Sequence, residues 1–225
     1  AMSLHRSLIT PTSNPLLEQA LRDKLQRRAG TAGNLGELEP LAIRLGLIQN
    51  TLKPRFRSPQ LLVFAADHGL AVDGVGASQR QSTARLATSL LSSQLPVSVF
   101  ARLQGLDVTV VDCGIAEPMA SHPRLLARKI AHGTRNARVS AAMSVEQAHA
   151  AIRAGMEIAD GLQGNVLACA GIGVGSHESA ALVLARLTQS PVRELIISGP
   201  QMSQDDLAHL QVVMQGAQGR HRDVT

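Results

Sequence analysis

One stretch of the chain decides the fold: LLVFAADHG at residues 61–69, in which a short apolar run is followed at once by polar turn residues. A run of six apolar residues bounded by turn residues is typical of a strand that is buried on both faces of a parallel sheet. The pattern therefore predicts a buried strand over residues 61–66 and a turn at Asp67, His68 and Gly69.

Three later segments repeat this pattern of a short apolar run that ends in small or polar residues. They are residues 108–114, residues 165–171 and residues 194–200. Stretches with helical periodicity lie between the runs, near residues 80–91, 96–104, 145–162, 177–189 and 204–217. Short apolar strands that alternate with amphipathic helices predict an α/β fold, in which helices wrap both faces of a parallel sheet in a Rossmann-like arrangement of three layers.

The residues before the first expected strand have a helical pattern instead. Asn14 and Pro15 offer a cap and a first-turn proline, and leucines then recur at helical spacing until Gly30. A second run of this kind covers residues 38–48. We therefore expect a small helical N-terminal subdomain at residues 1–57 and a parallel α/β domain at residues 58–225. The chain stops directly after a helical pattern without a closing strand, so we expect this domain to be cut short at its C-terminus.

Composition and charge restrict the classes of function. Aromatic residues make up 1% of the 225 residues, so platforms on which bases could stack are nearly absent. The formal net charge is +5 and the arginines are scattered, which favours a small anionic ligand over nucleic acid. No apolar run reaches the ~18 residues of a membrane span. Cys113 and Cys169 are too far apart in sequence for a C-x-x-C metal site, and two cysteines do not make a disulfide framework. We therefore expect a protein of the reducing cytoplasm in which both thiols are buried as small apolar side chains.

In parallel sheets, ligands bind at the carboxyl ends of the strands, and polar residues follow the first expected strand. Asp67 and His68 could bind polar substrate atoms or move a proton. Alternatively, Asp67 caps local backbone donors while Gly69 takes a turn conformation. The residues by themselves leave both interpretations open.

A glycine-rich turn joins the third expected strand to the next helix. Its residues are Gly171, Gly173, Gly175 and Ser176. In this context, backbone N–H groups can bind a phosphate at a helix N-terminus, and a plain tight turn is the alternative. His177 and Glu178 have no second histidine at the spacing of a metal pair, so we expect a solvated helix start. Ser203 and Asp206 predict a capping box for the last helix.

Together these motifs resemble, in order and spacing, the nicotinate-nucleotide:dimethylbenzimidazole phosphoribosyltransferase family. The resemblance covers nearly the whole chain from about residue 14, and it is carried by residues 38–49, 61–69, 74–75, 83, 110–115, 133–136, 141–144 and 171–173. It implies transfer of phosphoribose from nicotinate mononucleotide to 5,6-dimethylbenzimidazole, which gives α-ribazole phosphate for cobalamin. It also implies a homodimer. We expect the protein to be cytoplasmic, to need no cofactor or metal, and to bind neither nucleic acid nor membrane.

The resemblance further implies which residues contact the substrates. The base pocket would be bordered by Asp67, His68, Gly69 and Ser78. The phosphoribosyl side would be formed by Gly171, Gly173, Gly175, Ser176, Ser198 and Gly199.

The chain departs from the family pattern at three single positions and in the loop of residues 198–202, which stands where the family has Gly-Arg-Gly-Thr-Gly. Cys169 stands where the family has a site glutamate, Val174 replaces an asparagine and Leu210 replaces a lysine. The C-terminal glutamate that accepts the benzimidazole proton in the family is absent from this sequence, so the catalytic residues are left unassigned. A catalytically degenerate paralogue that binds a benzimidazole or a nucleotide, or that partners an active subunit, is therefore the alternative function.

Overall fold

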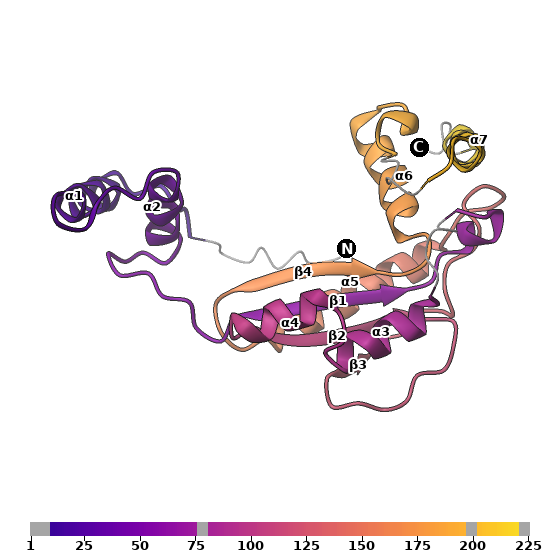
Figure 1. Ribbon diagram of the computed structural model, residues 1–225, viewed down its shortest axis with the longest axis horizontal. Coiled ribbons are helices and arrows are strands. Elements are labelled where there is room, and N and C mark those ends of the chain that lie inside the picture. Colours follow the sequence, from indigo (N-terminus) through magenta and orange to yellow (C-terminus); the bar gives the residue numbers. More distant parts are fainter. Residues whose placement is uncertain (1–9, 76–80, 197–201, 221–225) are drawn as a thin grey trace, which may run out of the picture. The chain divides into compact units, whose positions relative to one another are not determined.

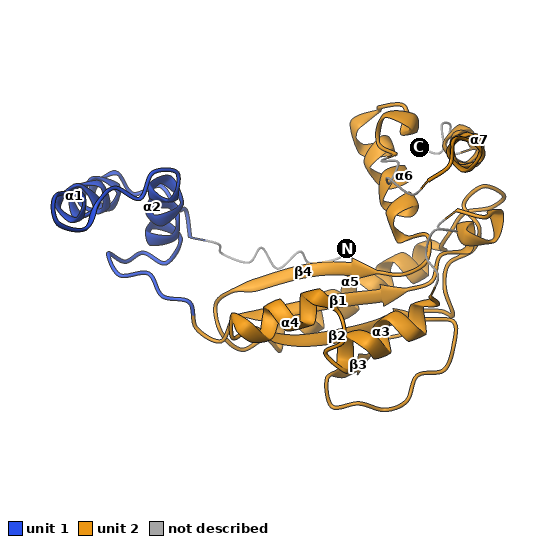
Figure 2. Ribbon diagram, in the orientation of Figure 1, with its two compact units in different colours: residues 1–56 blue, residues 57–225 orange. Residues whose placement is uncertain are grey.

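The computed structural model describes residues 10–75, 81–196 and 202–220. The chain forms two compact units, residues 1–56 and residues 57–225 (Figure 2). None of the helices in the described ranges is long and apolar enough to cross a lipid bilayer.

Two helices form the described part of the first unit. Helix α1 (Pro15–Ala32) starts with Pro15 in its first turn, and the side chain of Asn14 accepts the backbone N–H of Leu17 at 3.1 Å. Helix α2 (Leu38–Ile48) packs against α1 through Gly46, where an added Cβ would lie 2.6 Å from both methyl groups of Leu21. The expected cap is confirmed, and α1 continues two residues beyond Gly30.

The second unit is built on a sheet that contains four parallel strands in its described residues. The strands are β1 (Gln60–Ala66), β2 (Asp107–Gly114), β3 (Leu125–Ala127) and β4 (Leu167–Ile172). Their order across the sheet is β3-β2-β1-β4, so β1 lies between β2 and β4 (Figure 1). The strand predicted over residues 61–66 is therefore an interior strand of the sheet.

Helices cover both faces of this sheet, which confirms the predicted three-layer α/β fold. Leu61, Val63 and Ala65 point to one face, where they pack with α3 (Thr83–Leu91) and α4 (Pro96–Leu103). Leu62 points to the other face and packs with Ile158 of α5 (Val145–Asp160). In Figure 1, α3 and α4 lie in front of the sheet and α5 lies behind it.

The C-terminal part of this unit forms a second, largely helical core. It consists of α6 (Ser176–Thr188), α7 (Gln204–Arg220) and the short 3-10 helices η1 (Gly69–Asp73) and η2 (Val192–Glu194). Leu210 is buried in this core and packs with residues of α6 and η1. The serine half of the capping box predicted for α7 is confirmed, because Ser203 Oγ accepts the N–H of Asp206 at 3.1 Å. The Asp206 carboxylate accepts the Ser203 hydroxyl at 2.7 Å.

Two expectations about strands are wrong. The apolar run at residues 194–197 does not form a strand where it is described, because Val192–Glu194 is a 3-10 helix and Leu195 and Ile196 pack against the helical core. Gln218 of α7 satisfies the backbone of this segment, accepting from Val192 N–H at 2.9 Å and donating to the Ser190 carbonyl at 2.8 Å. The third expected strand is also shifted, since β4 continues through Gly171 to Ile172.

Candidate active site

Asp67 follows the last residue of β1 and connects three segments of the chain. Its Oδ1 accepts the hydroxyl of Thr83 at 2.5 Å, and its Oδ2 accepts the N–H of Ala116 at 2.7 Å. Its backbone carbonyl accepts the N–H of Thr134 at 3.1 Å. Both carboxylate oxygens are thus engaged by the protein itself, the arrangement that the capping interpretation describes.

Thr83 connects Asp67 to the glycine-rich turn. It is the first residue of α3 and is fully buried, and its hydroxyl oxygen accepts the N–H of Val174 at 3.0 Å. One hydroxyl therefore joins the end of β1, the start of α3 and the turn after β4. Sequence reasoning did not find this role, because a lone threonine at a helix start carries no signal of long-range contacts.

The loop of residues 133–136 packs closely on the turn after β1. A Cβ on Gly69 would lie 2.5 Å from backbone atoms of Thr134, Arg135 and Asn136, so only glycine fits there. The N–H of Gly69 donates to the Thr134 hydroxyl at 3.2 Å. The two segments therefore hold each other in place at the carboxyl edge of the sheet.

The glycine-rich turn contacts the end of β1 as closely. Gly173 has φ +150°, and an added Cβ would overlap the carbonyl oxygen of Ala66. Gly175 has φ +80° as the N-cap of α6, and Ser176 is the first residue of that helix. The N–H of Ser176 donates to the Gly173 carbonyl at 3.1 Å, and that of Val174 is bound to Thr83, so neither amide is free for a phosphate.

A cavity of about 680 Å³ opens beside these segments, at the carboxyl ends of β1 and β2. Its wall combines apolar groups such as Ile130 and Met143 with the side chains of His68, His132 and Arg135. The first turns of α5 close one side, where Ser144 and Gln147 form a capping box. The lining therefore offers a ligand apolar contacts together with the cationic guanidinium of Arg135.

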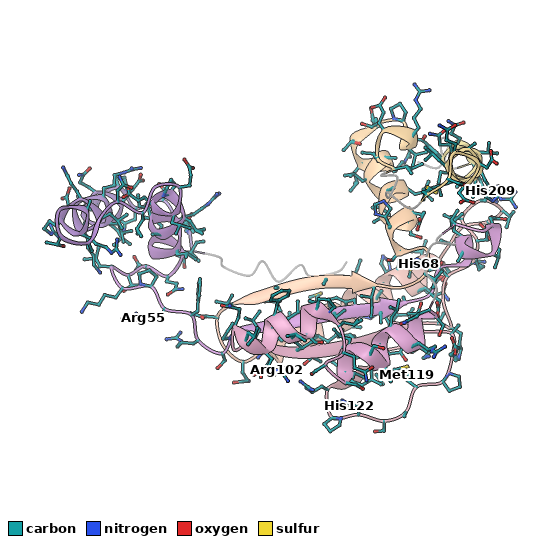
Figure 3. The ribbon with its side chains drawn as sticks, in the orientation of Figure 1. Arg55, His68, Arg102, Met119, His122 and His209 are labelled. Atoms are coloured by element: carbon teal, nitrogen blue, oxygen red, sulfur yellow. The ribbon has the colours of Figure 1, made fainter. Side chains whose placement is uncertain are left out.

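His68 lies on the cavity wall, at the end of the sheet from which α6 extends (Figure 3). Burial lowers the pKa of its imidazole, and the negative charges of Asp67 and Glu178 partly raise it again. The neutral imidazole that burial favours can accept a proton. Burial also raises the pKa of the neighbouring Cys113 thiol, which keeps it in its protonated form.

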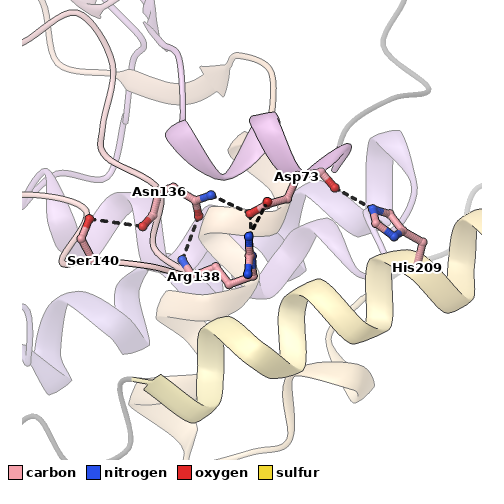
Figure 4. A network of polar contacts seen from close by, with 5 residues as sticks. All are labelled: Asp73, Asn136, Arg138, Ser140 and His209. Carbon is pink, nitrogen blue, oxygen red and sulfur yellow. Dashed lines mark hydrogen bonds and ion pairs between the residues drawn. The ribbon is translucent and has the colours of Figure 1, made fainter.

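A network of polar contacts around Asp73 holds together the segments that follow β1 and β2. Arg138 binds the Asp73 carboxylate through two contacts of 2.9 and 2.8 Å, and the Asn136 amide donates to it at 2.6 Å (Figure 4). These bonds hold the pKa of Asp73 at about 2. His209 Nε2 lies 2.6 Å from the Asp73 carbonyl oxygen, so η1, the loop of residues 133–136 and α7 are joined.

The remaining candidate residues have different surroundings. Cys169 is exposed on β4, where it pairs in register with Leu62 of β1. The expectation of a buried thiol is therefore wrong for Cys169. The reason is that the described residues leave both faces of β4 uncovered at this point. Glu178 is buried at the start of α6 while His177 is exposed, which corrects the expectation of a solvated helix start. Ser78, Ser198 and Gly199 lie outside the described residues.

Fold and site together define a three-layer α/β protein with a ligand cavity at the carboxyl edge of a parallel sheet. A family model described as phosphoribosyltransferase matches residues 10–225, and the chain belongs to this family. The resemblance seen in the sequence is thereby confirmed.

Individual relatives agree with this assignment. The chain is 35% identical to the nicotinate-nucleotide--dimethylbenzimidazole phosphoribosyltransferase of Janthinobacterium sp. (strain Marseille), over 95% of this chain and 62% of the relative. It is 39% identical to the enzyme of that name from Cupriavidus taiwanensis, over 93% and 60%. The crystal structure of CobT from Thermus thermophilus superposes with a TM-score of 0.82 at 29% identity, over 94% of this chain and 64% of that one. The chain thus spans about three-fifths of the length of these relatives.

Proposed function

We propose that this chain transfers phosphoribose from nicotinate mononucleotide to 5,6-dimethylbenzimidazole, forming α-ribazole phosphate. The observation that carries the proposal is the family match over residues 10–225, together with a cavity at the expected edge of the sheet. The relatives with 35–39% identity bear the name of this activity.

The lining of the cavity supports the proposal chemically. Apolar side chains suit the benzimidazole ring, and the guanidinium of Arg135 suits the negative charge of the mononucleotide. In the transfer, one nitrogen of the azole attacks C1 of the ribosyl group while nicotinate leaves, and the N–H of the other nitrogen must lose its proton. The position of His68 on the cavity wall supports a role in binding polar substrate atoms or in proton transfer, whereas Asp67 already accepts two hydrogen bonds from the protein.

The test is an incubation of the 225-residue chain with both substrates, followed by chromatography and mass analysis for α-ribazole phosphate. A full-length relative serves as the positive control and a His68→Ala variant as the matched negative control. Product above the His68→Ala background is the expected result. No product under conditions in which calorimetry shows both substrates bound would refute the activity.

We also propose that the chain acts as a homodimer. In support, α4 exposes the large apolar side chains of Val97, Phe100 and Leu103 on one side, and such patches mark association surfaces. Light scattering is expected to give twice the 23.8 kDa mass of one chain, and Phe100→Ser is expected to lower it. A monomer at all protein concentrations would contradict the proposal.

A further inference from the structure

A second cavity lies at the opposite end of the sheet from the candidate active site. It has a volume of about 440 Å³ and opens beside the first residues of β2, where α3 and α4 end. In Figure 3, Arg102 marks this end of the sheet and His68 marks the end that carries the candidate active site. We call it the amino-end pocket, because Arg102, Asp107 and Arg124 line it next to the amino end of β2.

Arg124 is held on the wall of the amino-end pocket by the chain itself. Its Nη2 donates to the Leu91 carbonyl at the end of α3, at 3.2 Å, and its backbone carbonyl accepts the N–H of Val110 of β2 at 2.9 Å. A guanidinium carries five N–H donors in a planar fork, so the bond to Leu91 leaves further donors for a ligand. The group is thereby positioned before a ligand arrives.

Arg102 supplies a second cation to the same wall. It lies in the last turn of α4, is exposed, and its side chain makes no hydrogen bond or ion pair within the described ranges. The acidic residue of the lining is Asp107, and neither arginine forms an ion pair with it in the part of the chain that the structure describes. The pocket therefore sets two guanidinium groups without an acidic partner against one carboxylate.

The ends of α3 and α4 do not cancel this positive charge. Free carbonyl groups at a helix C-terminus carry partial negative charge, but here they accept donors from the chain. The Leu90 carbonyl accepts the N–H of Ser93 at 3.1 Å, and the Ala101 carbonyl accepts the N–H of Leu106 at 2.9 Å. The charge that a ligand meets in the pocket is therefore set chiefly by the side chains of its wall.

The geometry of these donors favours a tetrahedral anion over a carboxylate. One guanidinium fork already satisfies both oxygens of a carboxylate, whereas a phosphate group has enough oxygens for two forks. Ser98 adds an acceptor, because its buried hydroxyl donates to the Leu95 carbonyl at 2.7 Å and keeps its lone pairs. The hydroxyl oxygen and the Asp107 carboxylate can accept a P–OH or sugar hydroxyl hydrogen of the ligand.

We propose that the amino-end pocket is a binding site for a phosphate group, which is held between the guanidinium groups of Arg102 and Arg124. Inorganic phosphate and a phosphate monoester share this chemistry. The site is separate from the cavity at the carboxyl ends of β1 and β2, and the proposal does not rest on the proposed transfer reaction.

NMR titration of the ¹⁵N-labelled chain with inorganic phosphate tests the site, with chloride keeping the ionic strength constant. The backbone amides of Gly105 and Leu106, which line the pocket, are expected to shift. Arg102→Gln is expected to weaken phosphate binding about tenfold, because a charge-assisted pair of hydrogen bonds is lost. The matched control is Arg153→Gln on α5, which removes the same charge from an exposed position outside the pocket and is expected to leave binding unchanged.

Two further measurements support the test. Phosphate is expected to raise the midpoint of thermal unfolding of the wild type and of Arg153→Gln, but not that of Arg102→Gln. Arg124→Lys keeps the charge and loses the fork, so it is also expected to weaken phosphate binding. Ribose 5-phosphate is then titrated under the same conditions, and the tighter of the two probes identifies the ligand as a monoester or as the free ion.

Three results would overturn the proposal. The first is the absence of phosphate-dependent shifts at Gly105 and Leu106 in the wild type, whatever happens at the other cavity. The second is equal phosphate affinity of Arg102→Gln and Arg153→Gln, which would show an effect of net charge only. The third is an equal rise of the unfolding midpoint in these two variants. An assay that detects no α-ribazole phosphate would refute the proposed function and would leave this inference unaffected.

Discussion

Replacing Thr83 with valine should separate the glycine-rich turn from the end of β1 without changing the shape of the core. Valine has nearly the volume of threonine, and position 83 is fully buried, so little packing is lost. The hydroxyl, however, donates to Asp67 at 2.5 Å and accepts from the Val174 N–H at 3.0 Å. Thr83→Val therefore leaves a carboxylate oxygen and a backbone N–H without their partner.

The magnitude follows from these two groups. An unsatisfied buried polar group costs about 1–3 kcal/mol, and more if it is charged, so we expect a loss of about 2–5 kcal/mol in the free energy of unfolding. With a urea m-value of about 2 kcal/mol/M, the midpoint of unfolding should fall by roughly 1–2.5 M. The assay is urea unfolding followed by circular dichroism, with the m-value checked for constancy.

The same helix provides the matched control. Thr88 lies further along α3, is exposed, and donates only to the Ala84 carbonyl at 2.8 Å within the helix. Thr88→Val should shift the midpoint little, and Thr83→Ser, which keeps the hydroxyl, should retain most of the stability. Equal midpoints for Thr83→Val and Thr88→Val would refute the role assigned to the hydroxyl.

Three further changes have defined outcomes. Gly173→Ala should destabilise the fold by several degrees in a thermal melt, because its Cβ would overlap a carbonyl oxygen, whereas Gly171→Ala, whose nearest neighbour would be 4.0 Å away, should not. Asp73→Asn should lower the free energy of unfolding at pH 7, because the pKa of Asp73 is depressed to about 2 in the folded chain. In acid titrations of unfolding, the difference in stability between this variant and the wild type should persist above about pH 4 and vanish as the pH falls through 2. Arg135→Gln should weaken calorimetric binding of nicotinate mononucleotide about tenfold while leaving benzimidazole binding unchanged, and equal losses for both ligands would contradict the charge assignment.

Local patterns were sufficient to predict the helices, the interior strand β1 and the edge of the sheet that carries the cavity. They failed where the outcome depends on distant residues. The apolar run at 194–197 has the pattern of a strand, yet Gln218 of α7 binds the backbone beside it. Strand β3 is three residues long, which is too short for a periodicity to show.

The candidate site divides in the same way. The Asp67-His68-Gly69 turn could be placed from its position after a strand. The partners of Asp67 could not, since Thr83 is 16 residues away and Ala116 is 49 residues away in the sequence. The burial of Glu178 could not be predicted from the sequence either, because an acidic residue in the first turn of a helix ordinarily faces solvent.

The strand order β3-β2-β1-β4 also creates a second feature next to the cavity. After β1 the chain proceeds outward to β2 and β3, and it then returns across the sheet to add β4 on the other side of β1. This reversal is a topological switch point, at which the segments leaving two neighbouring strands diverge and open a crevice beyond the strand ends. Gly175 packs on His68 at that divergence, and His68 also lines the cavity at the ends of β1 and β2, so the crevice and the cavity adjoin each other at one residue.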